Sequence, residues 1–159
     1  MDDAGLEPAV EPLRFLLGRW VGEGRGAYPT VEDFTYAEET TFAWPGPPRL
    51  ALGQRTWILP ERTPSHAELG HLRPTPSGVE LLVAHPSGVL ELSLGTVTGQ
   101  RLELASSAVV TSPTARSVTE VRRQYERRGD VLWYRLDMAA VGQPLGFHLE
   151  AELRWAGPG

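Results

Sequence analysis

The sequence contains no cysteine, no lysine and no asparagine among its 159 residues. Without cysteine there is no disulfide framework, no thiolate-bound zinc, no iron–sulfur cluster, no cysteine nucleophile and no covalently attached haem. Arginine is the only strongly basic residue, and 15 basic against 20 acidic residues give a formal charge of −5. This acidic balance argues against general nucleic-acid binding, which needs a basic surface for the phosphates.

Long apolar runs are also missing. No uncharged stretch is longer than 12 residues, the length from Leu104 to Ala115, which is shorter than the roughly 20 residues of a transmembrane helix. The start, Met1–Asp3, is acidic and lacks the basic-then-apolar pattern of a signal peptide. We therefore expect a cytoplasmic protein that does not enter a membrane. A chain of this length is expected to form one domain, residues 1–159.

Glycine and proline are frequent, with 17 and 14 residues respectively, and they separate short segments of alternating polarity. Turn residues at such intervals are typical of all-β sandwiches and barrels. The period of two predicts ten strands, near residues 18–25, 34–44, 50–59, 66–74, 78–85, 89–95, 101–107, 115–127, 131–141 and 146–155. Only residues 6–17 have helical spacing, and Pro8 and Pro12 interrupt it, so we expect a short helix or a 3₁₀ turn there.

Alternation also predicts which face of each strand is buried, since an antiparallel sheet can cover its core on one side and face water on the other. In residues 89–95, Leu90, Leu92 and Leu94 are expected on the apolar face, and Glu91 and Ser93 on the solvated face. Ten antiparallel strands are expected to close into a barrel, because closure removes the exposed edges. A barrel of this width encloses a cavity.

Four histidines are the only neutral nitrogen ligands: His66, His71, His85 and His148. His71 and His85 are expected on strand surfaces. Strict alternation places His148 on the solvated face with Glu150, but a bulge at the barrel rim would turn it inward. No nucleophile elbow, phosphate loop or Rossmann glycine pattern is present.

Two further clusters are interpreted as structural. Trp20 is expected to plug the base of the barrel, and the glycines around it permit strong coiling of the strand. Arg122, Arg123, Arg127 and Arg128 lie among glutamates and are expected on a mixed, solvated surface.

The sequence resembles the nitrobindins at its start, middle and end. The matching segments are Gly18-Arg-Trp-Val-Gly-Glu-Gly24, Tyr28–Thr30, Tyr36–Glu39, His66–Glu68, Gly70–Arg73, Ala84–Gly88, Glu91, Ala140–Leu145 and His148–Ala151. The resemblance covers about residues 13–155, the expected core of the domain. It implies a ten-stranded antiparallel barrel like that of fatty-acid-binding proteins, in agreement with the strand count.

The resemblance further implies one non-covalent haem b per subunit, with ferric iron bound by His148 as the proximal axial ligand. Thr41 matches a position that lines the haem site, and His66 matches a position in the distal pocket. Arg116 could pair with a haem propionate, since arginine suits bidentate carboxylate recognition. The alternatives give these residues no role in a site: His66 would be a histidine at the rim that faces water, and Arg116 would be a solvated charge on a strand.

The implied activity is reversible binding of nitric oxide and isomerisation of peroxynitrite to nitrate, in a pocket with largely apolar walls. The alternative function is an intracellular carrier of a fatty acid or another apolar ligand, because the same barrel serves that role and fold does not fix function. A nitric oxide sensor would need an output module, which we do not find here. The resemblance is compatible with a homodimer, although no run of residues identifies an interface.

Overall fold

The computed structural model describes residues 5–159, so the acidic start at Met1–Asp3 lies outside the described residues. A 3₁₀ helix, η1 (Glu11–Leu16), precedes ten strands. The strands are β1 (Gly18–Tyr28), β2 (Val31–Ala43), β3 (Leu50–Ile58), β4 (Thr63–Thr75), β5 (Gly78–His85), β6 (Val89–Thr98), β7 (Arg101–Thr111), β8 (Val118–Arg128), β9 (Val131–Ala140) and β10 (Gly146–Trp155). Within residues 5–159, no helix has the length and apolar character needed to cross a membrane.

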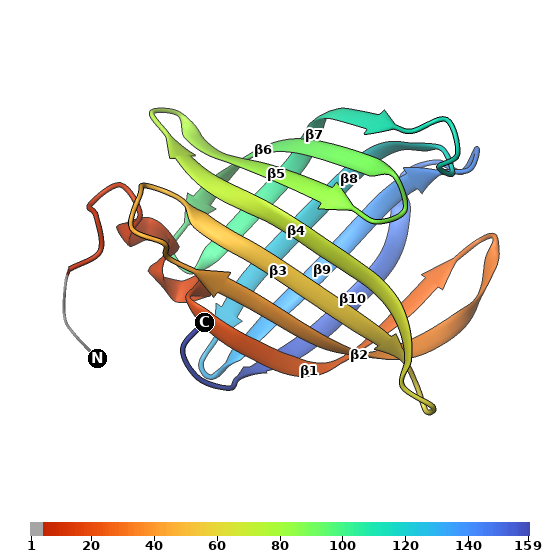
Figure 1. Ribbon diagram of the computed structural model, residues 1–159, viewed down its shortest axis with the longest axis horizontal. Helices are drawn as coiled ribbons and strands as arrows, with labels where there is room; N and C mark the ends of the chain where they lie inside the picture. The colour runs from red at the N-terminus through yellow and green to blue at the C-terminus, as the bar shows by residue number, and fades with distance from the viewer. Residues whose placement is uncertain (1–4) are drawn as a thin grey trace.

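The ten strands form one closed antiparallel barrel (Figure 1). Each strand pairs with its neighbours in sequence, and β1 also pairs with β10, which closes the sheet. The predicted all-β barrel is therefore confirmed. The strand ends differ in detail: β7 continues to Thr111, and β8 begins at Val118 rather than at residue 115. The pairing of β7 with β8 stops at Ala105–Arg122, so the part of β7 from residue 106 to Thr111 pairs with β6 alone.

One end of the barrel is closed by η1 and Trp20. Leu13 and Leu16 of η1 are buried, and Trp20 is fully buried beside them. The indole Nε1 of Trp20 donates a hydrogen bond of 2.7 Å to the Leu16 carbonyl, which fixes the helix against the strand. Pro12 lies in the first turn of η1, where a missing N–H costs little. The predicted short helical turn and the predicted plug are both confirmed.

The glycines of β1 make room for aromatic side chains from β2. A Cβ atom at Gly24 would lie 2.5 Å from Tyr36 Cζ, and one at Gly26 would collide with the Phe34 ring. Because Gly24 pairs with Tyr36 and Gly26 with Phe34 across the ladder, each ring lies over the glycine opposite it. Gly24 and Gly26 therefore shape the barrel interior.

The orientation of β6 is the reverse of the one predicted. Glu91 and Ser93 are 3 % and 1 % exposed, whereas Leu90 and Leu94 are 56 % and 47 % exposed. The prediction was wrong because Glu91 is satisfied inside the barrel: it accepts hydrogen bonds from Ser93 and from an arginine of β8. A buried charge that is paired and hydrogen-bonded can displace leucine from the core face.

Candidate functional site

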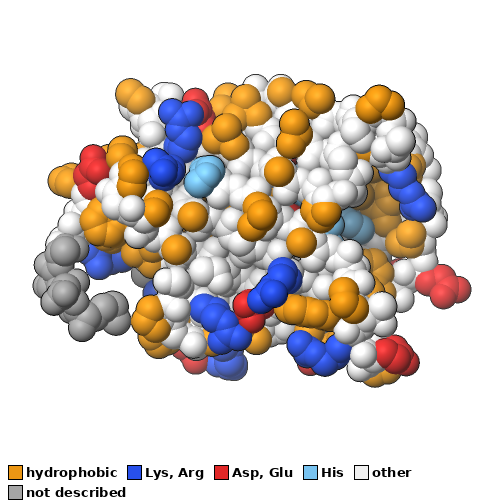
Figure 2. All heavy atoms as spheres, in the orientation of Figure 1, with side chains coloured by type: hydrophobic (Ala, Val, Ile, Leu, Met, Phe, Trp, Pro, Cys, Tyr) orange, Lys and Arg blue, Asp and Glu red, His pale blue; other side chains and the backbone are white. Residues whose placement is uncertain are grey.

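A cavity of about 480 Å³ occupies the end of the barrel opposite η1, within the roughly 300–1,000 Å³ typical of ligand sites. Figure 2 shows a hollow at this end, with histidine among apolar side chains. Eight of the ten strands contribute to the lining. The lining residues are Val31, Phe34, Tyr36, Thr56, Ile58, Ser65, His66, Glu68, His85, Ser87, Val89, Val118, Val121, Arg123, Leu136, Met138, His148 and Leu149.

His148 faces this cavity because β10 contains a bulge. In the ladder with β9, Phe147 pairs with Asp137 and Leu149 pairs with Leu136, so His148 is the extra residue. Both His148 and Leu149 then line the cavity, although adjacent residues of a regular strand face opposite sides. The inward-turning alternative for His148 is the one that the structure adopts.

The surroundings of His148 determine its protonation. Its ring lies edge-on to Tyr28, with centroids 5.3 Å apart, and to Phe34 at 6.4 Å. Burial lowers the pKa of His148 below its usual value, so the imidazole is neutral at pH 7. Its Nδ1 lies 3.4 Å from the carbonyl oxygen of Ala27. A proton on Nδ1 facing this carbonyl leaves Nε2 with a free lone pair, as a metal-binding imidazole requires.

The opposite wall of the cavity carries a buried ion-pair cluster of Arg123, Glu68 and Glu91. The Arg123 guanidinium donates to both oxygens of Glu68, at 2.8 and 3.0 Å, and to both oxygens of Glu91, at 3.0 and 2.7 Å. Arg123 also lies 3.4 Å from the Tyr134 hydroxyl, and its side chain is fully buried. The predicted surface location of Arg123 was wrong, because alternation along β8 turns Val121, Arg123 and Tyr125 inward.

The two carboxylates of this cluster are ionised. Burial alone would raise the pKa of each, but attraction to Arg123 and hydrogen bonds outweigh it. The pKa of Glu68 is held well below its usual range, and that of Glu91 is lowered to about 2. Two negative charges therefore surround one positive charge, so Arg123 has no free charge to offer a bound anion.

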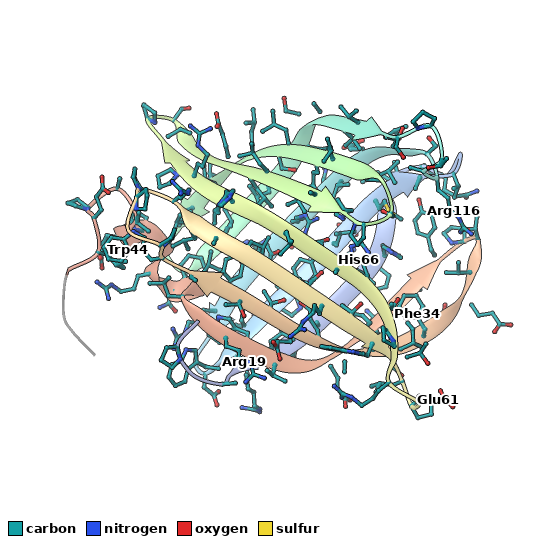
Figure 3. All side chains as sticks on the ribbon, viewed as in Figure 1. Arg19, Phe34, Trp44, Glu61, His66 and Arg116 are labelled. Atoms are coloured by element: carbon teal, nitrogen blue, oxygen red, sulfur yellow. The ribbon has the colours of Figure 1, made fainter. Side chains whose placement is uncertain are left out.

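His66 and His85 lie next to this cluster and line the same cavity. His66 Nε2 and His85 Nδ1 are 3.2 Å apart, and Figure 3 places His66 within the barrel wall at the cavity end. The predicted surface position of His85 was wrong: its side chain is only 10 % exposed, because it ends β5 with the inward phase set by Val83. His71 is on the outer face, as predicted.

Thr41 does not line the cavity, which corrects its predicted place at the haem site. Alternation turns Thr40 inward, where it is fully buried, and Thr41 therefore faces outward beside Gly53 and Arg55. Thr41 pairs with Arg19 near the closed end, whereas His148 contacts Ala27. Eight residues of β1 separate these positions, roughly 26 Å of extended strand.

Arg116 lies in the loop between β7 and β8, not in a strand, and is exposed. Figure 3 shows it at the same end of the barrel as Phe34 and His66. Across residues 5–159, no carboxylate forms an ion pair with Arg116. Its guanidinium is therefore free to meet a ligand that projects from the cavity.

The walls of the cavity are largely apolar, as the sequence predicted. The apolar lining includes Val118, Val121, Leu136, Met138 and Leu149. A polar patch of Glu68, His85 and Arg123, together with His66 and Thr56, interrupts it. One signal in the sequence points to these polar residues. The segments that resemble the family include His66–Glu68, Ala84–Gly88 and Glu91. Their local polarity pattern, however, does not predict that these side chains face inward.

Comparisons with known proteins agree on one family. Residues 9–154 match the model of the family described as THAP4-like, heme-binding beta-barrel domain. Peroxynitrite isomerase 2 of Mycobacterium ulcerans is 46 % identical over 156 residues, covering 95 % of this chain and 97 % of that protein. Peroxynitrite isomerase 1 of Mycobacterium tuberculosis is also 46 % identical, covering 93 % and 95 %. The crystal structure of Rv2717c from M. tuberculosis superposes with a TM-score of 0.88 at 45 % identity, covering 95 % of this chain and 99 % of that one.

Proposed function

Because the chain belongs to the THAP4-like, heme-binding β-barrel family, we propose that it binds one haem b non-covalently through His148 and isomerises peroxynitrite to nitrate. The activity is the one named for relatives that are 46 % identical over nearly the whole chain. Reversible binding of nitric oxide belongs to the same proposal, since the same ferric haem would bind it.

The observation that carries this proposal is the bulge at His148. It places a neutral imidazole in a cavity of ligand size, with Nδ1 directed at a backbone carbonyl and Nε2 left free. A carrier of apolar ligands has no use for such an arrangement. The donor set therefore fits a haem held by a single histidine, with no thiolate or amine ligand available in the sequence.

Each wall of the cavity has a separate task in this proposal. Ferric haem, when bound, would supply a Lewis acid that can bind a small anion. His148 binds and orients the group, and Tyr28 and Phe34 hold the imidazole ring in place. Apolar residues of the lining, from Val118 to Leu149, exclude water from the cavity. In this proposal Arg116, which lies at the same end of the barrel as His66 (Figure 3), pairs with a propionate at the mouth.

The carrier alternative is disfavoured by the state of Arg123. A fatty-acid carboxylate would need an inward arginine with free charge, and Arg123 does face the cavity. Its donors, however, are already directed at Glu68 and Glu91, and a third carboxylate would be repelled by both.

Stopped-flow decay of peroxynitrite tests the catalytic part of the proposal. The ferric, haem-loaded protein is expected to accelerate the decay in proportion to its concentration and to raise the nitrate yield above that of buffer. Haem-free protein is the matched control and should leave both quantities unchanged. A nitrate yield equal to that of the buffer control would reduce the function to ligand binding.

The homodimer stays a prediction, and the structure offers one surface for it. The reversed strand β6 exposes Leu90 and Leu94. On the same outer face, Leu69 of β4 and Val110 of β7 are 71 % and 60 % exposed. Hydrophobic side chains are visible across this outer face of β4–β7 in Figure 2. We expect the unmodified chain to have twice its monomer mass in light scattering and Leu90→Glu to return it to the monomer. A monomer mass for the unmodified chain would contradict the prediction.

A further inference from the structure

Three donor atoms on the polar wall of the cavity form a nearly equilateral triangle. His66 Nε2 lies 3.2 Å from His85 Nδ1 and 3.4 Å from Glu68 Oε1, and His85 Nδ1 lies 3.5 Å from the same oxygen. A tetrahedral ion with bonds of about 2.0–2.1 Å to nitrogen and oxygen has edges of about 3.3–3.4 Å between its ligand atoms. The triangle thus has the dimensions of one face of such a site.

The groups behind these donors are those that a metal site needs. When a histidine binds a metal through one nitrogen, the other nitrogen usually donates its proton to a carboxylate. His85 Nε2 lies 3.4 Å from Glu91 Oε2. This buried nitrogen has no hydrogen-bond partner within residues 5–159. A metal on Nδ1 would place the proton on Nε2, opposite Glu91.

Glu68 is also prepared for this role. Arg123 holds its two oxygens in a fixed orientation, at 2.8 and 3.0 Å. A carboxylate oxygen has two lone pairs, so Oε1 can accept from Arg123 and still bind a cation. Glu68 and Glu91 together outweigh the single charge of Arg123, which leaves the cluster with a formal charge of −1 and favours a cation beside it.

We propose that His66 Nε2, His85 Nδ1 and Glu68 Oε1 bind one divalent cation of the zinc type, with a fourth position open to the cavity. Two imidazoles and one carboxylate suit Zn²⁺, whereas Mg²⁺ and Ca²⁺ prefer oxygen ligands alone. The site lies on the wall that carries Arg123, it does not include His148, and it does not rest on the proposed haem function.

Zinc titration of the haem-free, full-length chain tests the site by isothermal calorimetry. We expect one Zn²⁺ per chain, and we expect His66→Ala and His85→Gln each to weaken binding by about 100-fold or more. His66 is the safer substitution for the fold, since its side chain is 34 % exposed. The matched control is His71→Ala, which removes a histidine from the outer face and should bind Zn²⁺ normally. Thermal melting of each variant separates lost coordination from unfolding.

Two further measurements define the donor set. Co²⁺ in place of Zn²⁺ is expected to give the intense visible bands of four-coordinate cobalt. His148→Ala is expected to lose haemin binding and to keep Zn²⁺ binding, so the two proposals can fail separately. The proposal is overturned if the unmodified chain binds no Zn²⁺, if His66→Ala binds it as tightly, or if the His148→Ala or His71→Ala variant loses it.

Discussion

The two ends of the barrel are built from the same strands but by opposite rules. At the closed end, Trp20 and the leucines of η1 fill the interior, and the one polar atom of Trp20 is satisfied by a neighbouring carbonyl. At the cavity end, the interior holds His148, the two carboxylates around Arg123, and about 480 Å³ of space. The first arrangement provides stability through burial, and the second retains a site at a cost in packing. Substitutions at the two ends should therefore change different measured quantities.

The largest effect is expected at the closed end. Trp20→Ala removes a fully buried indole and its hydrogen bond to Leu16, and should lower the free energy of unfolding by about 3–5 kcal/mol. Urea denaturation monitored by circular dichroism measures this loss. Haemin should still bind to the folded fraction, because the cavity is at the other end. Trp155→Ala, which removes a half-exposed indole, is the control and should cost clearly less. An equal loss of free energy of unfolding in the two variants would contradict the structural role of Trp20 at the closed end.

A second effect concerns Glu38, which lies inside the barrel between the two ends. Burial raises its pKa to about 7, although hydrogen bonds from Thr40 and Gln54 oppose this. The folded state thus favours the neutral acid. The contribution of Glu38 to the free energy of unfolding is fully present below its ordinary pKa of 4.5 and is lost as the pH rises through 7. The free energy of unfolding therefore falls by up to about 3 kcal/mol over this range.

Glu38→Gln keeps a side chain of the same size with a carbonyl acceptor, but the side chain does not titrate. The free energy of unfolding of this variant should therefore not show the fall between pH 4.5 and 7 that is due to Glu38. The comparison is made as a difference from the unmodified chain, because His148 acts in the opposite direction. Its lowered pKa gives stability that is present above the ordinary value and lost as the pH falls. Glu23→Gln, on the outer surface, is the control. Parallel stability curves for the Glu38→Gln variant and the unmodified chain would show that Glu38 does not titrate in this range.

The smallest effect is expected at the mouth of the cavity. Arg116→Gln removes an exposed charge that pairs with no carboxylate in the described chain, so the stability should be unchanged. The haemin affinity should fall by less than about fivefold, since an exposed ion pair contributes at most about 1 kcal/mol. Fluorescence quenching by haemin measures the affinity, with the exposed Arg62→Gln as control. An affinity that does not fall would remove Arg116 from the site.

The sequence predicted the closed end better than the cavity end, and the reason is physical. The strands, the plug at Trp20 and the turn at η1 depend on local periodicity and on the spacing of glycine and proline, which are visible in any window of the sequence. The orientation of Glu91 and Arg123 depends on a partner far away: Arg123 meets Glu68 at a separation of 55 residues. Alternation alone therefore predicts that the leucines of β6 face the core, and this prediction was wrong.

His148 is the intermediate case. Strict alternation placed it on the solvated face, and the inward orientation required a bulge that local polarity does not encode. The structure supplies the bulge between Phe147 and Leu149. At Thr41 the resemblance was the source of the error. It assigned Thr41 to the haem site, but the inward-facing residue of β2 at this point is its neighbour Thr40.

Haemin titration of the His148→Ala variant tests the central claim most directly. The unmodified, haem-free chain should develop a sharp Soret band that saturates at one haemin per chain, and His71→Ala should give the same band and the same affinity. His148→Ala is expected to fold normally and to lose both the band shape and most of the affinity. If His148→Ala instead binds haemin as tightly as the unmodified chain, with the same spectrum, His148 is not the ligand and the account of the cavity is wrong.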